Sequence, residues 1–306
     1  MFKILRLLLQ REFILFLALA LGLFIGQGAK LTEKTVLPAL AIIMTLATMS
    51  IPDRIFREPR QIILNSLAGL GMNYGILTSF ILVCNFLFIN DEALRTGFVL
   101  LAAVPPAVAV IPFSVMLKGR SSFALLATVG CYLGALVLTP IITIGFLGSG
   151  FVKINKIAII MAELILLPLI FSRVLIWIKV APRLEPYKGK IINWGFFLVV
   201  YTIVGLNQEL FLRQTYILLI PALIALGSTF LLGFIINKIS RLWHIDHPMR
   251  INLVLLGTHK NTGLAGGLAL ALYSEKTALP ATITTVFMLV YVIWLSFQGR
   301  RSAASR

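Results

Sequence analysis

The sequence predicts an all-α polytopic membrane protein with ten transmembrane helices, arranged as two inverted five-helix repeats. Three observations predict this fold. Hydrophobic residues fill 59% of the 306 positions and charged residues only 12%, about half the charged share of soluble domains. Apolar runs of the roughly 17–25 residues that a helix needs to cross a bilayer recur along the chain. Two of these runs, at corresponding places in the two halves, are interrupted by helix-breaking residues.

The apolar runs define the spans and leave only short connections, in which no separate domain has room. The first run also resembles a secretion signal, because a basic start precedes an apolar stretch and a Gly-Gln-Gly-Ala sequence. We interpret it as a helix, since its removal would leave nine spans and no symmetry. The predicted spans are 13–29, 35–51, 62–88, 94–116, 121–147, 154–173, 190–206, 215–237, 250–273 and 277–297.

Basic residues are distributed unevenly between the two sides that these spans define. The two ends of the chain and the loops on their side hold 19 Lys and Arg residues, and the opposite loops hold 7. Because cytoplasmic loops are enriched in Lys and Arg, both termini are predicted to be cytoplasmic, in the inner cell membrane. The net charge of +16 is then a consequence of topology and of contact with anionic lipid, so nucleic-acid binding is the weaker interpretation.

A short motif recurs in the two halves. Arg95 followed by Val99-Leu100-Leu101 returns 155 residues later as Arg250 followed by Val254-Leu255-Leu256. Each copy begins a predicted span. Taken alone this likeness is weak, because Val-Leu-Leu is common in membrane helices.

Both of these spans are interrupted. Pro105 and Pro106 remove two backbone donors from the fourth span, and Thr258–Gly263 forms a polar interruption in the ninth. Residues 1–150 are therefore predicted to be the first repeat and 151–306 the second, which is inverted because five is odd. Inverted repeats with paired broken helices are typical of secondary transporters. The alternative is two ordinary kinked helices.

The polar residues of the ninth span are the candidate substrate or coupling site: Thr258, His259, Lys260, Asn261 and Thr262. A lysine at this depth costs about 2.5–3.5 kcal/mol, so it needs a reason. Asn261 and Thr262 are expected to face a cavity. His259 is either a pH-responsive cavity group or a partner for a local carbonyl. Lys260 is either a coupling or substrate-binding group, or a fixed structural cation.

One acid and two cysteines also lie within apolar spans. Glu163 is expected to be functional, because acids are rare inside membranes, with Lys260 or Asn193 as partner; the alternative is a packing acid. Cys84 and Cys131 lie in separate spans and indicate neither a disulfide framework nor a metal site. No nucleotide, cofactor or catalytic motif is visible, so neither a cofactor nor an enzyme is predicted.

With these features the chain resembles the bile acid:sodium symporter family. The run Asn261–Ala265 is similar to that family's Gln-Asn-Ser-Gly-Leu signature in the ninth helix. Ala103–Ala107 through Lys118-Gly119 resembles its crossover in the fourth, and Thr139-Pro140 resembles the end of its fifth. The resemblance implies a panel of helices 1, 2, 6 and 7 that rocks against a core of helices 3–5 and 8–10, in which helices 4 and 9 cross.

The chain departs from this family at the positions that the resemblance assigns to two sodium ions. Val110-Ile111 replaces a Ser-Asn pair, Tyr132 replaces a hydroxyl ligand, Leu256 replaces an acid, and Lys260 replaces the signature Gln. Asn73 corresponds to a third-helix Gln and stays polar. Sodium needs several oxygen ligands, whereas an ammonium group only donates hydrogen bonds.

We therefore expect the Lys260 ammonium to take the place of the second sodium, held by Asn73 and by carbonyls freed at the break in helix 9. The first sodium site is expected to be replaced by apolar packing. Transport is then predicted to be sodium-independent and either coupled to protons, with Lys260 gaining and losing one, or uncoupled.

The predicted function is alternating-access transport of a small organic anion, which the resemblance and a cationic cavity bounded by helix ends imply. One alternative is an arsenite or weak-acid exporter; Cys84 and Cys131 speak against it, because neither falls at the fourth-helix break. A transport-inactive membrane sensor is the second alternative. A membrane-embedded enzyme is the third, without a nucleophile to accompany Lys260 and Glu163.

Overall fold

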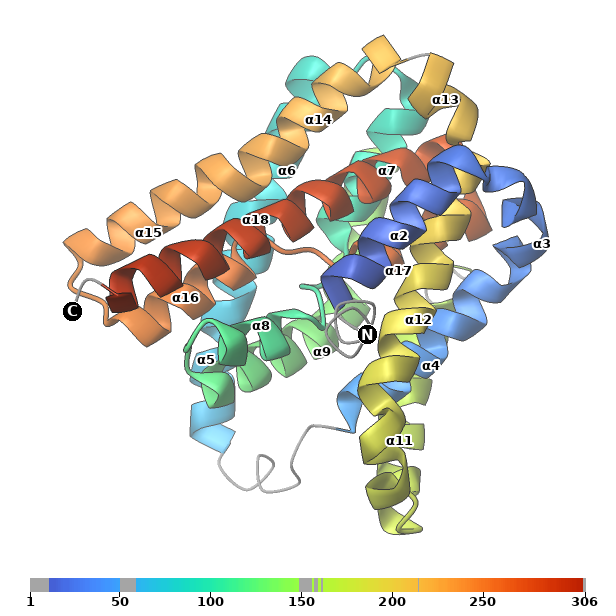
Figure 1. Ribbon diagram of the computed structural model, residues 1–306. Helices are drawn as coiled ribbons and strands as arrows, with labels where there is room; N and C mark the ends of the chain where they lie inside the picture. The colour runs from blue at the N-terminus through green and yellow to red at the C-terminus, as the bar shows by residue number, and fades with distance from the viewer. Residues whose placement is uncertain are drawn as a thin grey trace.

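The computed structural model describes residues 11–49, 59–148, 156, 159–160, 162–213 and 215–304, which form helices and no strand (Figure 1). The helices of the first half are α2 (Arg11–Phe24), η1 (Gly26–Gly28), α3 (Ala29–Thr32), η2 (Glu33–Thr35), α4 (Val36–Thr48), α5 (Pro59–Leu70), η4 (Gly71–Leu77), α6 (Thr78–Phe88), α7 (Glu92–Ala103), α8 (Val110–Met116) and α9 (Ser121–Leu147). The second half contains η5 (Ala162–Leu166), α11 (Leu167–Trp177), α12 (Ala181–Leu206), α13 (Gln208–Arg213), η6 (Thr215–Leu218), α14 (Leu219–Leu226), η7 (Gly227–Leu231), α15 (Leu232–Leu242), α16 (His247–Leu256), α17 (Thr262–Leu272), η8 (Lys276–Ala278) and α18 (Leu279–Ala304).

Several helices confirm that the chain is built to cross a membrane. Six helices in the described part are long and apolar enough to span a bilayer: Gly26–Thr48, Ile62–Phe88, Ser121–Leu147, Ala181–Leu206, Tyr216–Leu242 and Lys276–Ser296. The fourth and ninth predicted spans are each divided into two shorter helices, as their breaking residues predict. Part of the predicted sixth span lies outside the described residues, and the total of ten spans stays a prediction.

Helices extend beyond the apolar runs from which they were predicted. The seventh span was expected from residue 190, yet α12 begins at Ala181. The eighth was expected to end at 237, yet α15 continues to Leu242. Hydropathy marks only the part of a helix that lies in hydrocarbon, whereas Lys, Arg and Glu favour helix as strongly as most apolar residues do. Charged first and last turns therefore continue the helices outside the apolar stretch.

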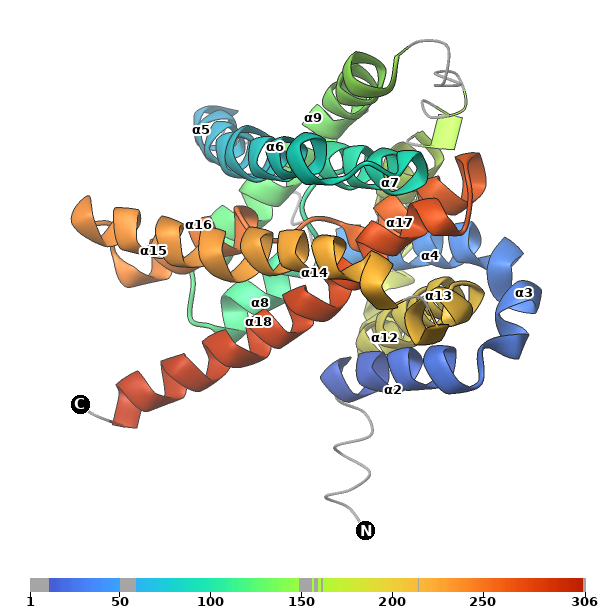
Figure 2. The same ribbon diagram turned by 90° about the horizontal axis from the view of Figure 1, so that it is seen from above.

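The helices pack in two groups. In the first group α12 lies against α2 and α4, and α4 lies against α11. In the second, α9 packs against α5, α7 and α8, while α18 packs against α14, α17 and α7. The first group forms one side of the molecule in both views (Figures 1 and 2). The two groups meet where α17 contacts α4 and α12.

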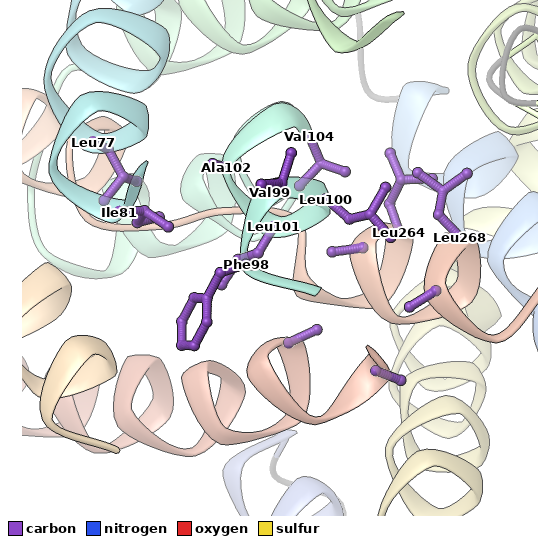
Figure 3. Close-up of a cluster of buried hydrophobic side chains, with 14 of the residues drawn as sticks. Leu77, Ile81, Phe98, Val99, Leu100, Leu101, Ala102, Val104, Leu264 and Leu268 are labelled. Carbon is purple, nitrogen blue, oxygen red and sulfur yellow. The ribbon is translucent and has the colours of Figure 1, made fainter. Parts of the chain in front are cut away.

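The hydrophobic core is centred on α7. Every residue from Gly97 to Ala103 is buried, so this helix is covered on all sides, as expected for a helix that is apolar all round. Leu77 and Ile81 of the third span and Leu264 and Leu268 of α17 pack around it (Figure 3). The break after α7 is therefore held at the centre of the second group of helices.

A close contact at Gly233 provides a test of this packing. A Cβ atom there would meet the phenol of Tyr291, which is 1% exposed, and would lie 3.3 Å from Cγ2 of Thr258. Overpacking of this kind costs about 1–3 kcal/mol. We expect Gly233→Ala to lower the apparent melting temperature in detergent by several degrees. The matched control is Gly75→Ala, in another membrane helix with nothing within 4 Å of its Cβ position, where no decrease is expected. Equal melting temperatures for the two variants would contradict this packing.

Candidate functional site

The two interrupted helices meet backbone to backbone at their breaks. The N–H of Asn261 donates to the carbonyl of Pro105 (2.8 Å), and the N–H of Ala107 donates to that of His259 (3.3 Å). These bonds form an isolated antiparallel bridge between Pro106 and Lys260. Figure 2 shows the connections between α7 and α8 and between α16 and α17 near the centre of the molecule. Segments separated by about 155 residues thus satisfy each other's freed backbone groups.

Side chains of other helices bond carbonyls that are freed at the end of α7. Because Pro105 and Pro106 have no N–H group and the helix stops, the last turn of α7 lacks its usual donors. The Thr78 hydroxyl donates to Ala102 O (2.6 Å), and the Thr139 hydroxyl donates to Ala103 O (2.7 Å). The next carbonyl, of Val104, is bonded by a charged group.

That charged group is the Lys260 ammonium. Its Nζ donates to Asn73 Oδ1 (2.8 Å), Thr78 Oγ1 (2.9 Å) and Val104 O (2.9 Å) and lies 4.5 Å from the centre of the Tyr74 ring. The side chain is 1% exposed. Three acceptors match the three N–H bonds of an ammonium, whereas a neutral amine would offer only two. The arrangement therefore favours a fixed, fully bonded cation.

Asn73 connects the ammonium to the backbone of the break in helix 9. Its Oδ1 accepts from Lys260, while its Nδ2 donates to Leu256 O (2.9 Å) and His259 O (3.2 Å), which the break after α16 leaves free. The predicted Lys260–Asn73 partnership is confirmed. The predicted use of helix-9 carbonyls by Lys260 is wrong: its carbonyl partner is Val104 of the other break, because Asn73 already occupies those of helix 9.

The start of α17 carries the other candidate residues. Asn261 caps the helix by accepting from the N–H of Leu264 (3.0 Å) and donates through Nδ2 to the Tyr132 hydroxyl (2.8 Å). The Thr262 hydroxyl accepts from that of Thr285 (2.7 Å). The resemblance places Tyr132 at the first sodium site. Apolar packing was expected at that site. Val110 and Leu256 do pack in one buried apolar cluster, whereas Tyr132 forms a hydrogen-bonded pair with Asn261.

Thr258 and His259 lie inside the protein. The Thr258 hydroxyl donates to Val254 O (2.6 Å) and is 2.8 Å from Nδ1 of His259. The His259 ring is 0% exposed and lies edge-on to Phe113 with 5.9 Å between ring centres. Its position is that of a packed, locally bonded side chain rather than a cavity group.

A small cavity lies beside α17, between the two groups of helices. It has a volume of about 60 Å³ and is bounded by Leu15 of α2, by α12, by the fourth-helix break and by α18. Its polar lining residues, among those described, are Asn261, Thr262, Thr282 and Thr285, and no charged side chain lines it. Contrary to expectation, Lys260 does not face this cavity, since its amine points to Asn73 and Val104. Gly263 lines the wall at the first turn of α17.

Glu163 lies apart from the crossing. It belongs to η5, which packs against α4 and α11, and its side chain is exposed. It is not among the three groups bonded to Lys260, so the pairing considered from the sequence does not form. In the described part of the chain no group of three His, Cys, Asp or Glu residues could hold a metal ion.

Thr78 and Val104 were not predicted from the sequence as partners of Lys260. The available signal was the spacing of Asn73 and Thr78, which suits a π-helical turn rather than an α-helical one. In η4 this turn buries Asn73, Tyr74 and Leu77 together, next to Thr78. Such π-turns are frequent at functional sites. Val104 could not be identified, because a backbone carbonyl leaves no mark in the sequence.

Comparison with known proteins places the chain among membrane transporters. Residues 8–298 match the SBF-like CPA transporter family. No curated protein matches the chain. The match covers both broken helices, the cavity and all described helices that pack around them, and it supports the family-level resemblance that the motifs of the fourth and ninth spans indicate.

Proposed function

The chain belongs to the SBF-like CPA transporter family, and on that premise we propose that it transports a small organic anion by alternating access, without sodium. The observation that carries the proposal is the crossing of two broken helices beside a cavity between two packed groups of helices. Broken helices place free helix ends near the midplane of the membrane, where substrates of secondary transporters bind. The organic solute is the substrate, and the lipid bilayer is the surrounding medium.

The anionic character of the substrate is inferred from the start of α17. Asn261, Thr262 and Gly263 line the cavity at the N-terminal end of this helix, where the helix dipole favours negative charge. Lys260 lies just before this helix end, and its positive charge has the same sign as the N-terminal end of the helix dipole. Apart from Thr282 and Thr285, the remaining wall is apolar and includes Phe196 and Ile203 of α12. A small molecule with one carboxylate and a short apolar body fits these features.

Many secondary transporters alternate their access through two inverted copies of one unit, and the residues at the helix ends support such a repeat here. Asp91 and Asp246 each stand four residues before the repeated Arg, also 155 residues apart. Asp91 pairs with Lys276 at the start of η8 (2.5 Å), and Asp246 pairs with Arg120 at the start of α9 (3.1 Å). Each pair thus connects the beginning of a broken helix to the last helix of the other half. We place residues 1–150 and 151–306 in the two repeats on this basis.

Sodium independence is proposed because Lys260 occupies a site built from oxygen acceptors. Asn73, Thr78 and Val104 supply three oxygens of the kind that hold a sodium ion. With the ammonium bonded to them, a second cation is excluded by repulsion. Because all three N–H bonds are used, we propose that Lys260 stays charged and that proton coupling, if present, uses another group.

Flux of radiolabelled organic acids into reconstituted vesicles tests the function. We expect uptake and substrate-stimulated exchange at equal rates with inward sodium and inward potassium gradients. Uptake that requires a sodium gradient would contradict the role proposed for Lys260 while leaving the transporter intact. If organic acids stabilise the protein in a thermal-shift screen but none of them is exchanged across the vesicle membrane, the transport-inactive sensor is favoured instead.

A further inference from the structure

Three helices end in the same unusual way. At the ends of α8, α11 and α15 the residue one position beyond the cap has a positive φ: Lys118 (60°), Lys179 (59°) and His244 (55°). Apart from Gly148, these are the positive φ angles in the described part of the chain. L-residues pay a steric cost in this left-handed region, which is why glycine usually occupies it.

The hydrogen bonds identify each of these ends as the same capping motif. At α11 the N–H of Val180 donates to Leu175 O (3.0 Å), and the N–H of Lys179 donates to Ile176 O (3.1 Å). The ends of α8 and α15 have the same two bonds, with 6→1 bonds of 2.7 and 2.9 Å. These two bonds define the Schellman motif, which forms equally well with glycine at the left-handed position. The backbone therefore does not require a basic residue at any of the three positions.

At α15 the helix dipole does not require His244, because Arg241 already lies in the last turn. The last turns of α8 and α11 contain no basic residue, and a basic side chain placed there would satisfy the dipole without a left-handed residue. Lys118, Lys179 and His244 are exposed, and within the described residues neither lysine ammonium has an ion-pair or hydrogen-bond partner. Three times, then, the chain accepts local strain to present a basic side chain outward.

The three helix ends share one side of the molecule. The salt bridge from Arg120 to Asp246 joins the loop after α8 to the loop after α15. Arg173 donates to Thr48 O (2.7 Å), which places the end of α11 beside the end of α4. In Figure 1 these ends lie on the side opposite α3 and α13. This side contains the basic loops that the charge distribution assigns to the cytoplasm.

Aromatic side chains accompany two of the three ends. Trp177, two residues before Lys179, is 82% exposed, and Trp243, next to His244, is 75% exposed. Tryptophan is enriched where a membrane protein meets the lipid headgroups, because its ring is apolar and its N–H is polar. Lys179 is thus held beside a residue that marks the headgroup level.

We propose that Lys118, Lys179 and His244 bind the phosphate groups of anionic phospholipids at the cytoplasmic face. The left-handed cap then directs each basic side chain toward the headgroups, and for Lys179 and His244 the neighbouring tryptophans define the depth. The inference rests on the proposed orientation of the protein and is independent of the substrate. Basic residues near an anionic leaflet are attracted to it individually, so losing one should remove a measurable part of the stabilisation by such lipid.

Three variants of Lys179 separate charge from backbone strain. The measurement is the melting temperature of the full chain in neutral detergent, alone and with added phosphatidylglycerol or phosphatidylcholine. The native protein should be stabilised more by phosphatidylglycerol. Lys179→Gly should melt higher without lipid, since strain is relieved, but should lose at least a third of the extra stabilisation. Lys179→Gln should lose the same share of the phosphatidylglycerol stabilisation, but its melting temperature without lipid should not rise. Lys179→Arg should behave as the native protein does.

Lys34→Gln, an exposed lysine on the opposite side, is the matched control and should keep the full phosphatidylglycerol effect. A Lys179→Gln protein with an unchanged effect would overturn the proposal, as would an equal loss in the Lys34 variant. Inorganic phosphate alone should give no stabilisation. If it reproduces the phosphatidylglycerol effect, the site binds a free anion and the lipid assignment is wrong. Flux without sodium is measured separately, so failure of either proposal leaves the other standing.

Discussion

Replacing Lys260 by alanine is expected to abolish transport, and methylammonium is expected to restore part of it. The substitution removes the cation from a fully buried site and leaves Asn73 Oδ1, Thr78 Oγ1 and Val104 O without a donor. Each buried acceptor left unpaired costs about 1–3 kcal/mol. We expect the melting temperature in detergent to fall by more than ten degrees and the initial rate of uptake to fall at least tenfold.

Rescue by an added amine shows whether transport requires the positive charge at this site or only a side chain that fills the space. The truncated side chain leaves room for a small ammonium ion, which can donate to the same three oxygens. Lys260→Met is the control, because its side chain has similar length, no charge and leaves no such space. It should be as inactive as the alanine variant, and methylammonium should not rescue it. Native transport rates in the alanine variant would show that Lys260 has no role in transport.

The second large effect is expected at Asn73. Asn73→Leu keeps the branched shape of the side chain but removes the acceptor for Lys260 and both N–H donors to Leu256 O and His259 O. Because the side chain is 0% exposed, water cannot replace these partners readily. We expect a loss of about 3 kcal/mol or more in the free energy of unfolding and little remaining transport, measured by thermal shift and by vesicle uptake.

Two companion variants refine this prediction. Asn65→Leu, on the same membrane helix, changes a half-buried amide with no hydrogen bond among those described and should be almost neutral. Asn73→Asp keeps an acceptor for Lys260 but turns a second oxygen toward two carbonyls, so it should be intermediate. A leucine variant as stable as the native protein would mean that Asn73 does not hold the crossing together.

The breaks were predictable because proline chemistry and polarity act locally. Pro105 and Pro106 lack donors whatever surrounds them, and a run such as Thr258–Gly263 cannot continue an apolar helix without partners. The pairing of Lys260 with Asn73 was also predictable, since a buried cation needs an acceptor and the resemblance indicated one. The Thr78 hydroxyl left only an indirect signal, its spacing from Asn73, and the Val104 carbonyl left none, because a backbone group has no mark in the sequence.

The direction of the Lys260 side chain shows where sequence reasoning stops. Position in the break suggested a cationic cavity, but the amine is turned away from the cavity toward η4 and the end of α7. That choice depends on which acceptors lie within 3 Å once the two breaks cross. Lys260 and Val104 are 156 residues apart, so no local pattern relates them.

The sequence by itself determined that this chain is a membrane protein of helices, where two of those helices break, and which family it resembles, because hydropathy, proline geometry and motifs are properties of neighbouring residues. The tertiary structure alone decided which oxygens surround the buried ammonium, that Asn261 bonds Tyr132, and that the cavity wall is uncharged. The physical reason is that a buried polar group takes whatever partner folding brings within hydrogen-bond distance, and this is settled by packing between helices far apart in the chain.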